Sequence, residues 1–280
     1  MLKIKYELPE SESAELLIIS DVHIGNPLCN EAEFKQFVDY IKEEPDDPKM
    51  ARICILNGDL TESVTRNSKG NLFDLTMTPS VQVATIIKYL LPLTETSRKY
   101  PMGKIISYCA GNHDEGRYKD TGISAAESIA VGLGLEDRFS TDGCYSFINL
   151  RQMYQKTNEK FITHTVYNTH LTGGSVTTGA KANRITRVSQ GVLADVVIGS
   201  HFHSPMTFKE DIIVPQTHEC MLTQKTITYV ISNAFLRYGD YVQRNGYKPG
   251  TIAEPRIYIL QAREPKKNRQ RRYTYTEVLL

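Results

Sequence analysis

The chain is organised around one segment, Leu16-Leu17-Ile18-Ile19-Ser20-Asp21-Val22-His23-Ile24-Gly25-Asn26. Its leading run of apolar residues is typical of a strand buried on both faces in a layered sheet. Residues i and i+2 of a strand point to the same side, so Asp21 and His23 can converge where this strand ends. A carboxylate and an imidazole at that spacing form half of a site for a divalent transition metal. A turn cap beside a solvated ring is the plainer interpretation of the same pair.

The next apolar run repeats this pattern. Residues 52–56 predict a second buried strand, which ends in Asn57-Gly58-Asp59. Between the two strands, residues 31–44 carry apolar side chains at i, i+3, i+4 and i+7, the spacing of an amphipathic helix, and Pro45 ends it. Strand, helix and strand in this order predict parallel strands and an α/β layer.

The remainder of the first half continues the alternation. Thr78-Pro79 is typical of a helix start, because Thr is a good N-cap and Pro suits the first helical position. Residues 104–110 predict a third strand, which leads into Gly111-Asn112-His113-Asp114-Glu115 as a loop. Residues 124–133 predict a short helix.

From residue 145 onward, strands follow one another with one weakly helical stretch at 181–192. We expect strands at 146–150, 160–168, 196–200, 212–215, 226–233 and 254–261, and a C-terminal hairpin formed by 256–261 and 273–278. This pattern predicts a second sheet packed on the first. No linker separates the halves, so we expect a single domain, 1–280, with a β-rich portion at about 206–280. The predicted class is α/β with α+β character, a two-sheet β-sandwich core flanked by helices.

Composition narrows the classes of function. The chain has 33 basic and 32 acidic residues, so no global charge indicates a nucleic-acid or membrane partner. Its five cysteines are widely spaced without a Cys-x-x-Cys pair, a pattern typical of reduced thiols. No apolar run approaches ~18 residues, and the N-terminus has no signal-peptide core. We therefore expect a cytoplasmic protein that does not bind membranes.

The polar strand ends form one ordered set. They are Asp21-x-His23, Gly58-Asp59, Gly111-Asn112-His113-Asp114, His170, and Gly199-Ser200-His201-Phe202-His203. In open α/β sheets, sites form beyond the carboxyl ends of the strands, so we expect these groups to meet at one edge. Asp59 is best suited to lie between two ions, since a carboxylate can give one oxygen to each. Two ions about 3.5–4 Å apart would clamp a phosphate for in-line attack.

This ordered set resembles the calcineurin-like metallophosphoesterases over roughly residues 16–205. The resemblance extends to phage, bacterial and DNA-repair-nuclease members, and it implies the fold of that family. It implies two divalent ions, manganese above all, with iron, zinc, nickel or magnesium as alternatives. One ion would be held by Asp21, His23, Asp59 and His203, and the other by Asp59, Asn112, His170 and His201. One departure is the inserted Ser200, where the family usually has Gly-His-x-His.

Two histidines compete for the fourth motif. His164 and His170 lie six residues apart on a strand or on its exit. His170 stands at the carboxyl end, as the other proposed ligands do, so we assign the ligand role to His170. His164 is then a core or sheet-surface histidine.

The resemblance also implies catalytic and substrate-binding roles. His113 corresponds to the residue that contacts phosphate and protonates the leaving oxygen, which suits a histidine near neutral pH. Asp114 could orient its ring through the other nitrogen. Arg117, Lys181 and Arg184 could bind a substrate phosphate, although a solvated arginine and a flexible loop are the alternatives. The basic run at 266–272 is either a solvated hairpin tip or a phosphate-binding segment.

We therefore expect a dinuclear-metal phosphoester hydrolase. The form Asp21-Val22-His23-Ile24-Gly25 resembles nuclease-type members, which favours a phosphodiesterase acting on nucleic acid or a nucleotide. A phosphomonoesterase, including a phosphoprotein phosphatase, is the first alternative. An inactive binding subunit with the same fold is the second. A homodimer is possible with each of these functions.

Overall fold

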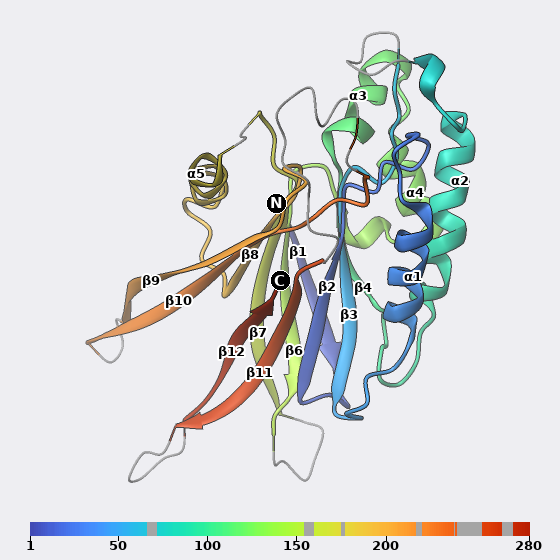
Figure 1. Cartoon of the computed structure of the whole chain (residues 1–280). Coiled ribbons are helices and arrows are strands. Elements are labelled where there is room, and N and C mark those ends of the chain that lie inside the picture. The colour runs from blue at the N-terminus through green and yellow to red at the C-terminus, as the bar shows by residue number, and fades with distance from the viewer. Residues whose placement is uncertain are drawn as a thin grey trace.

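The computed structural model describes residues 1–65, 72–153, 160–174, 177–216, 220–237, 239, 254–264 and 271–280. These residues form two six-stranded sheets packed face to face, with helices on the outer surfaces (Figure 1). The predicted class, an α/β two-sheet core flanked by helices, is confirmed.

The first sheet, here the β2 sheet, is built on the segment around Leu16. Its strands are, in spatial order, β12 (Arg271–Leu279), β11 (Arg256–Glu264), β2 (Ser13–Ile19), β3 (Met50–Asn57), β4 (Ile105–Cys109) and β5 (Phe139–Ser140). Strands β2 to β5 run parallel, as the strand–helix–strand order predicted, and β11 joins β2 in the antiparallel sense. The expected C-terminal hairpin is the β11–β12 pair.

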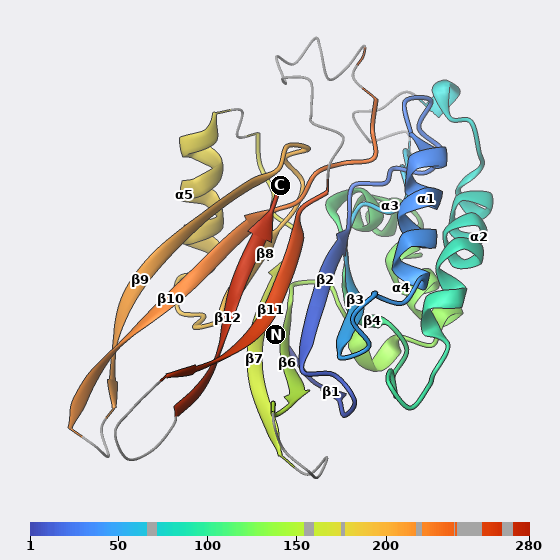
Figure 2. The ribbon, with the colours of Figure 1, turned by 60° about the horizontal axis from the view of Figure 1, so that its bottom comes forward.

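Helices cover the outer face of the β2 sheet. They are α1 (Glu31–Lys42), α2 (Pro79–Leu90) and α4 (Ala125–Leu133), whereas α3 (Asn112–Thr121) follows the end of β4 and contacts α4; short 3₁₀ turns lie at Leu72–Asp74, Leu91–Thr94 and Glu136–Arg138. Three of these helices were expected. The exception is α3, because the segment that begins with Asn112 was predicted to be a loop. Figure 2 shows α1, α2 and α4 side by side on this face.

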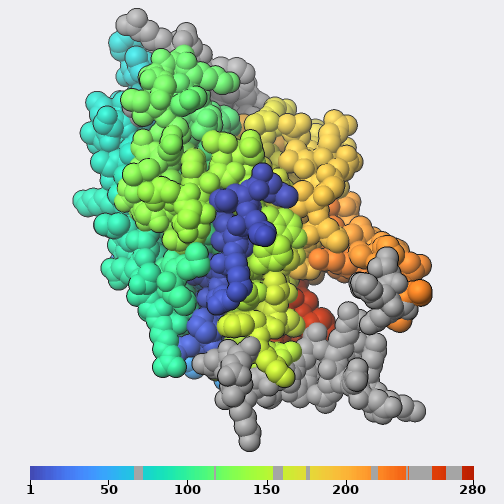
Figure 3. All heavy atoms as spheres, turned by 180° about the vertical axis from the view of Figure 1, so that it is seen from behind, coloured from blue at the N-terminus to red at the C-terminus, as the bar shows by residue number. Residues whose placement is uncertain are grey.

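The second sheet, here the β7 sheet, contains β1 (Leu2–Leu8), β6 (Cys144–Arg151), β7 (Phe161–Thr169), β8 (Val196–Gly199), β10 (Met221–Ile231) and β9 (Met206–Gln216). The first strand, β1, forms one edge and runs along β6 at the surface (Figure 3). Helix α5 (Thr178–Val188) packs on the outer face through Ile185. At the other edge, β9 and β10 form a long hairpin that projects from the body of the molecule (Figure 1).

The apolar segment of β2 explains how the layers pack. Leu16 and Ile18 point between the two sheets, where they join residues such as Ile148 of β6. Leu17 and Ile19 point to the opposite side and pack with the helices. All four are fully buried, each worth about 1.5–3 kcal/mol of burial free energy. A strand between two apolar layers needs apolar residues at every position, which is why the run is continuous.

This arrangement brings the carboxyl ends of β2, β3 and β4 to one edge, and the ends of β7 and β8 reach the same edge from the second sheet. The candidate site lies there. Among the described residues, no helix has both the length and the apolar character needed to cross a membrane.

Candidate metal centre

The polar side chains that follow five strands gather at this edge. They come in chain order from the ends of β2, β3, β4, β7 and β8: Asp21 and His23, Asp59, Asn112, His170, and His201 with His203. Asp21 and Asp59 are almost completely buried. The structure brings together all seven residues for which the sequence predicted a metal-ligand role.

Unusual backbone geometry marks the same positions. Five of the proposed ligands have positive φ, between 49° and 84°: Asp21, His23, Asp59, His201 and His203. This conformation costs roughly 1–3 kcal/mol for a residue with a side chain, and it persists only where the surroundings enforce it. Here the amide of Asp21 donates to the carbonyl of Gly58, and the amide of His23 donates to the carbonyl of Asp59, each at 3.0 Å. The two chain exits therefore hold each other in the turns that aim the side chains into the cluster.

Two glycines let the strand ends approach each other closely. Gly58 has φ +85°, and a Cβ there would lie 2.6 Å from both Gly111 Cα and His170 Nδ1. A Cβ on Gly111 would lie 2.1 Å from the amide nitrogen of Asp59. Neither position can accept a side chain without displacing the cluster.

The ligand atoms of the predicted residues fall into two groups, and His23 also belongs to a third group that could hold an ion, with Glu62 and His113. In the first, those of Asp21, His23 and His203 lie within 4.8 Å of one another. His203 Nε2 is 3.2 Å from Asp21 Oδ1 and 3.4 Å from His23 Nε2. Two imidazole nitrogens and a carboxylate oxygen thus point at one another, an arrangement that a shared cation would stabilise.

The second group consists of Asp59, His170 and His201, whose ligand atoms also lie within 4.8 Å of one another. His170 Nε2 is 3.1 Å from Asp59 Oδ2 and 3.2 Å from Asn112 Oδ1. Asp59 Oδ2 is also 4.0 Å from His23 Nε2 of the first group. One carboxylate oxygen therefore faces both groups, whereas the sequence analysis expected one oxygen for each ion, because Asp59 Oδ1 accepts from the amide of His113 at 2.8 Å.

The polar atoms of this cluster fit divalent cations. Asp21 Oδ1 and Asp59 Oδ2 are buried, and each faces an imidazole nitrogen, at 3.2 Å and 3.1 Å, without the geometry of a hydrogen bond. A cation between these nitrogen and oxygen atoms would bind both, and a buried carboxylate oxygen without a well-formed hydrogen bond is otherwise costly. Nitrogen and carboxylate donors together suit ions such as zinc, iron or manganese.

Hydrogen bonds on the far side of two rings set their tautomers. His170 Nδ1 lies 2.7 Å from the carbonyl oxygen of Asn57, which can only accept, so the proton resides on Nδ1. His23 Nδ1 lies 2.9 Å from Glu62 Oε2, and the same argument applies. In the neutral form that a metal ligand requires, each ring would therefore turn its Nε2 lone pair toward the cluster.

The electrostatics of the cluster also favour a cation. Burial alone would lower the pKa of His170, but the carboxylate of Asp59 outweighs burial and raises that pKa to about 10. Burial would raise the pKa of Asp59, yet His170 and His113 hold it well below its usual range. The carboxylates thus draw positive charge into a buried space, and a divalent ion would supply it.

His113 lies beside the first group. Its Nδ1 is 3.1 Å from the carbonyl oxygen of Glu62, and its ring centroid is 4.7 Å from that of His23. Burial would lower the pKa of His113, but the carboxylates of Asp59 and Glu62 outweigh it and raise that pKa. The ring is thus set to carry a proton at the edge of the cluster.

The predicted role of Asp114 needs correction. Its carboxylate accepts hydrogen bonds from the amides of Asp59 and Gly111, each at 3.1 Å, and from the hydroxyl of Thr61 at 2.9 Å. The ring of His113 instead uses the backbone carbonyl of Glu62. Asp114 is the third residue of α3, in its first turn, and its side chain points back at the strand ends. It fixes the backbone that carries Asp59 and does not orient His113.

Two functional partners were missed from the sequence. Glu62 orients His23, and Asn57 orients His170 through its carbonyl. Glu62 stands three residues after Asp59, where the sequence predicted only the start of a polar loop. An acidic residue that close to a proposed ligand was the available signal for Glu62, whereas a backbone carbonyl leaves no signal in a sequence.

The inserted Ser200 has a structural explanation. It is fully buried, and its hydroxyl accepts from Asn57 Nδ2 at 2.6 Å and from the hydroxyl of Ser232 at 2.9 Å. These bonds join the ends of β3, β8 and β10 beneath the cluster. The insertion therefore adds an anchor under His201 and His203 and leaves their spacing intact.

The three predicted substrate-binding residues have different surroundings. Lys181 on α5 is buried, and its ammonium donates to the hydroxyl of Ser204, next to His203. Arg184 is farther along the helix and donates to the hydroxyl of Thr172 at 2.8 Å. Arg117 lies in α3, and its side chain is outside the described residues. Of the three, Lys181 directly contacts the loop that carries two proposed ligands.

The chain has distant structural likenesses among known proteins. No family model matches the chain, and no curated protein matches it. It is similar to a solved structure of an uncharacterized protein, a predicted phosphoesterase, from Streptococcus pneumoniae: 9% identity, TM-score 0.36, covering 94% of this chain and 98% of that one. It is also similar to zinc-complexed Vps29 from Entamoeba histolytica: 11% identity, TM-score 0.34, covering 95% and 96%.

Such distant likenesses say nothing about the activity of this chain. Its own residues define an α/β two-sheet protein with a buried cluster, at the strand ends, that can hold divalent cations.

Proposed function

We propose that this protein is a dinuclear-metal phosphoester hydrolase, and more specifically a phosphodiesterase acting on nucleic acid or a nucleotide. The observation that carries the proposal is the pair of adjacent ligand groups, with Asp59 Oδ2 of the second group 4.0 Å from His23 Nε2 of the first. A single structural ion would need one group. Two adjacent groups joined by a carboxylate suit a pair of ions that clamps a phosphate.

In this proposal, one ion is held by Asp21, His23, His203 and Asp59, and the other by Asp59, Asn112, His170 and His201. When bound, the two ions would polarise the phosphoryl group and activate water as the nucleophile. Nitrogen and oxygen donors leave several metals open, and we propose manganese.

His113 would supply the proton for the leaving oxygen. The carbonyl of Glu62 engages Nδ1, so Nε2 is the nitrogen from which the ring can donate. The neighbouring carboxylates raise the pKa of His113, which favours the protonated ring near neutral pH. A positioned acid of this kind is worth about 10²–10⁴-fold in rate.

Lys181 and Arg184 would attract the anionic substrate from α5. The contact between Lys181 and Ser204 places an ammonium group beside the loop of His201 and His203. The preference for a diester rests on the resemblance of the Asp21-Val22-His23-Ile24-Gly25 motif to nuclease-type proteins. Cys29, Cys54, Cys109 and Cys144 are free thiols, which supports the proposed cytoplasmic location.

The decisive experiment compares two reporters, bis-p-nitrophenyl phosphate and p-nitrophenyl phosphate, with added Mn²⁺ and with chelator. We expect chelator-sensitive hydrolysis that favours the diester. Preference for the monoester would move the proposal to a phosphatase. If neither reporter is cleaved and the purified chain binds less than one ion, the inactive binding subunit becomes the better interpretation.

A further inference from the structure

The shortness of β8 leaves a notch in the β7 sheet. β7 pairs with β8 only over Val166–Thr169, and β10 pairs with it only over Thr228–Ile231. Upstream of these pairs β7 and β10 separate, and the β9–β10 hairpin swings away (Figures 1 and 2). Among the described strands, none pairs with β7 at 161–165 or with Gln224 and Thr226 of β10 on the sides that face each other. Two free strand edges therefore border this notch.

Asp195 closes the apex of the notch. Its carboxylate accepts from the amide of Thr165 at 2.7 Å, and its backbone joins both edges, donating to the Thr165 carbonyl and accepting from the amide of Thr228. Lys225 of β10 neutralises it at 3.0 Å. One side chain thus occupies the place that the next residue of a longer β8 would fill.

Below the apex, the backbone of both edges points into the notch. Successive residues of a strand direct their backbone groups to alternate sides. Because Thr165 and Thr228 bond toward Asp195, the groups of Thr163 on β7 and of Gln224 and Thr226 on β10 face the same space. Unpaired edges of this kind are templates for another strand.

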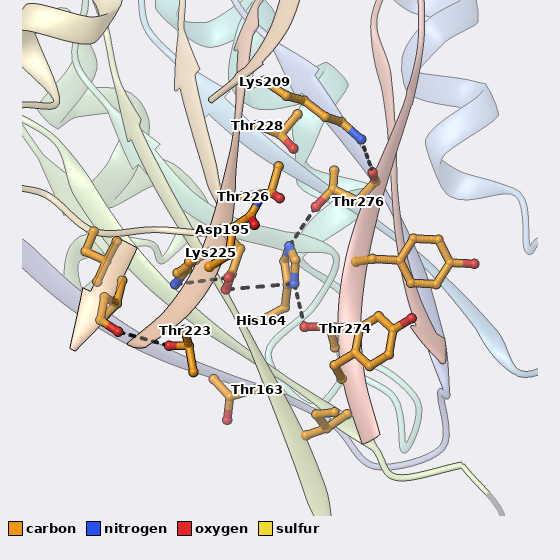
Figure 4. Close-up of a pocket in the computed structure, with 16 residues that line it drawn as sticks. Thr163, His164, Asp195, Lys209, Thr223, Lys225, Thr226, Thr228, Thr274 and Thr276 are labelled. Atoms are coloured by element: carbon orange, nitrogen blue, oxygen red, sulfur yellow. Dashed lines mark hydrogen bonds and ion pairs between the residues drawn. The ribbon is translucent and has the colours of Figure 1, made fainter. Parts of the chain in front are cut away.

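A cavity of about 820 Å³ occupies the notch and the space behind it. Seen from behind, the molecule is hollowed between the β9–β10 hairpin and β7, with C-terminal residues in red at the floor (Figure 3). That floor includes Thr274 and Thr276 of β12. The ring of His164 lies between these two hydroxyls, 2.9 Å and 3.1 Å away (Figure 4).

Polar side chains take inner positions of the lining, beside apolar Ile162, Leu193 and Val214, where the interior of a sandwich would be apolar throughout. Above the notch, the sheets meet through residues such as Val166 and Val230. In the notch, the corresponding inner positions are His164, Thr226 and Thr228. Burying these polar side chains under a bound molecule costs little free energy if that molecule brings hydrogen-bonding groups of its own, as a polypeptide backbone does.

Charge indicates the character of that partner. Lys225 is paired with Asp195, whereas Lys209 of β9 donates only to the backbone carbonyl of Thr276 at 3.0 Å. No carboxylate of the described residues pairs with Lys209. The side chain of Lys209 extends across the cavity from β9 to Thr276 of β12 (Figure 4). An acidic side chain entering there would neutralise it.

We propose that this notch is the docking site for an extended, acidic segment of a partner polypeptide, which adds as a strand in line with β8. The segment would pair with the free edge of β7 or β10 and place a carboxylate against Lys209. Strand addition of this kind takes affinity from backbone hydrogen bonds and specificity from side-chain positions. The notch lies at the opposite end of the sheets from the metal cluster, so this interaction does not depend on the proposed activity.

The experiment selects binders to the full chain from a phage-displayed library of random 12-residue peptides. We expect the selected peptides to be rich in β-branched and acidic residues. On Lys209→Glu, their affinity should fall at least about 10-fold, while Lys35→Glu, an exposed lysine on α1, should leave it unchanged. Thr163→Pro removes one amide donor from the edge and should also weaken binding. Melting curves establish that each variant is folded.

Hydrogen exchange locates the peptide independently of any variant. Bound peptide should slow exchange of amides in 161–165 or 222–227. Absence of any selected binder would overturn the proposal, as would binders unaffected by Lys209→Glu that slow no exchange at these edges. A single-stranded 12-nucleotide probe that binds through Lys209, when no peptide does, would reassign the cavity to nucleic acid.

Discussion

The two ends of β7 each bury a histidine, and the two rings behave in opposite ways. His164, near the start of the strand, lies between the hydroxyls of Thr274 and Thr276. Burial lowers its pKa to about 4. His170, just past the other end, faces the carboxylate of Asp59, which outweighs burial and raises the pKa to about 10.

This contrast shows that burial does not make a metal site. Hydroxyl partners satisfy both nitrogens of His164 and leave a neutral, fully bonded ring. At the other end, the carbonyl of Asn57 satisfies one nitrogen of His170, and the second nitrogen faces an oxygen that lacks a hydrogen-bond partner among the described residues. An incomplete set of partners, with carboxylates included, is what makes a buried cluster able to take a cation.

Of the substitutions at the metal end of β7, Asp59→Asn should have the largest effect on activity and metal binding. The amide keeps the shape of the side chain but removes the charge that faces both ligand groups. We expect hydrolysis of the diester reporter to fall to the level without enzyme and bound metal, measured by elemental analysis, to fall below one ion per chain. Asp39→Asn on the surface of α1 is the matched control. Full metal content in Asp59→Asn would show that Asp59 is not a ligand.

His113→Ala tests whether the proton donor is separate from the ligands. Its Nδ1 bonds the Glu62 carbonyl and not a ligand, so removing the ring should lower kcat about 10²–10⁴-fold while metal content stays at the wild-type level. Steady-state kinetics with elemental analysis on the same sample decide this. If activity and metal content fell together, His113 would be a ligand or a determinant of the fold.

The parallel core of the fold could be predicted from the sequence because its signal is local. Continuous apolar runs mark β2, β3 and β4, and a helical period marks α1. Helix α3 gave no such signal, since Asn112–Thr121 has no apolar face. It forms because Asp114 accepts from the Gly111 amide at its start and Gly122 ends it in the left-handed conformation. That support depends on tertiary position.

In the candidate site, too, the residues with a local sequence signal could be predicted and those that depend on tertiary position could not. Strand ends with Asp, Asn and His indicated which residues meet, and choosing His170 over His164 needed only its place at the end of β7. Partners outside the motifs were not predictable. Glu62 reaches His23 across 39 positions of sequence because two chain exits run side by side. The expected contact between Asp114 and His113 was wrong for a related reason, because the first turn of α3 directs Asp114 away from the ring.

His164 itself supplies a pH test. Its pKa is about 4 in the folded protein against an ordinary value near 6.5, so between these values the unfolded chain binds more protons. Stability should therefore fall as the pH drops from 6.5 toward 4, by up to about 3 kcal/mol from this group. Urea unfolding at pH 7 and pH 4.5 measures the fall.

His164→Asn is the comparison variant, since an amide can bond both threonines without titrating. We expect a smaller loss of stability on acidification and unchanged metal content. The same substitution at the other end, His170→Asn, should lower metal content. Equal pH dependence in wild type and His164→Asn would contradict the assigned pKa.

Glu62→Gln should give the smallest effect and separates charge from geometry at the metal end. Glu62 does for His23 what the Asn57 carbonyl does for His170: it holds the proton on Nδ1 and leaves Nε2 for the metal. Glutamine can still accept that hydrogen bond, so the tautomer survives while the ligand becomes less basic. We expect metal affinity, measured by competition with a chelator, to fall about 10–100-fold. Glu136→Gln, exposed near β5, should not change it. Glu62→Ala removes the hydrogen bond as well as the charge, so it should weaken metal binding further than Glu62→Gln. If the two variants bound metal equally, Glu62 would act through its charge alone. Its role would then differ from that of the Asn57 carbonyl, which carries no charge.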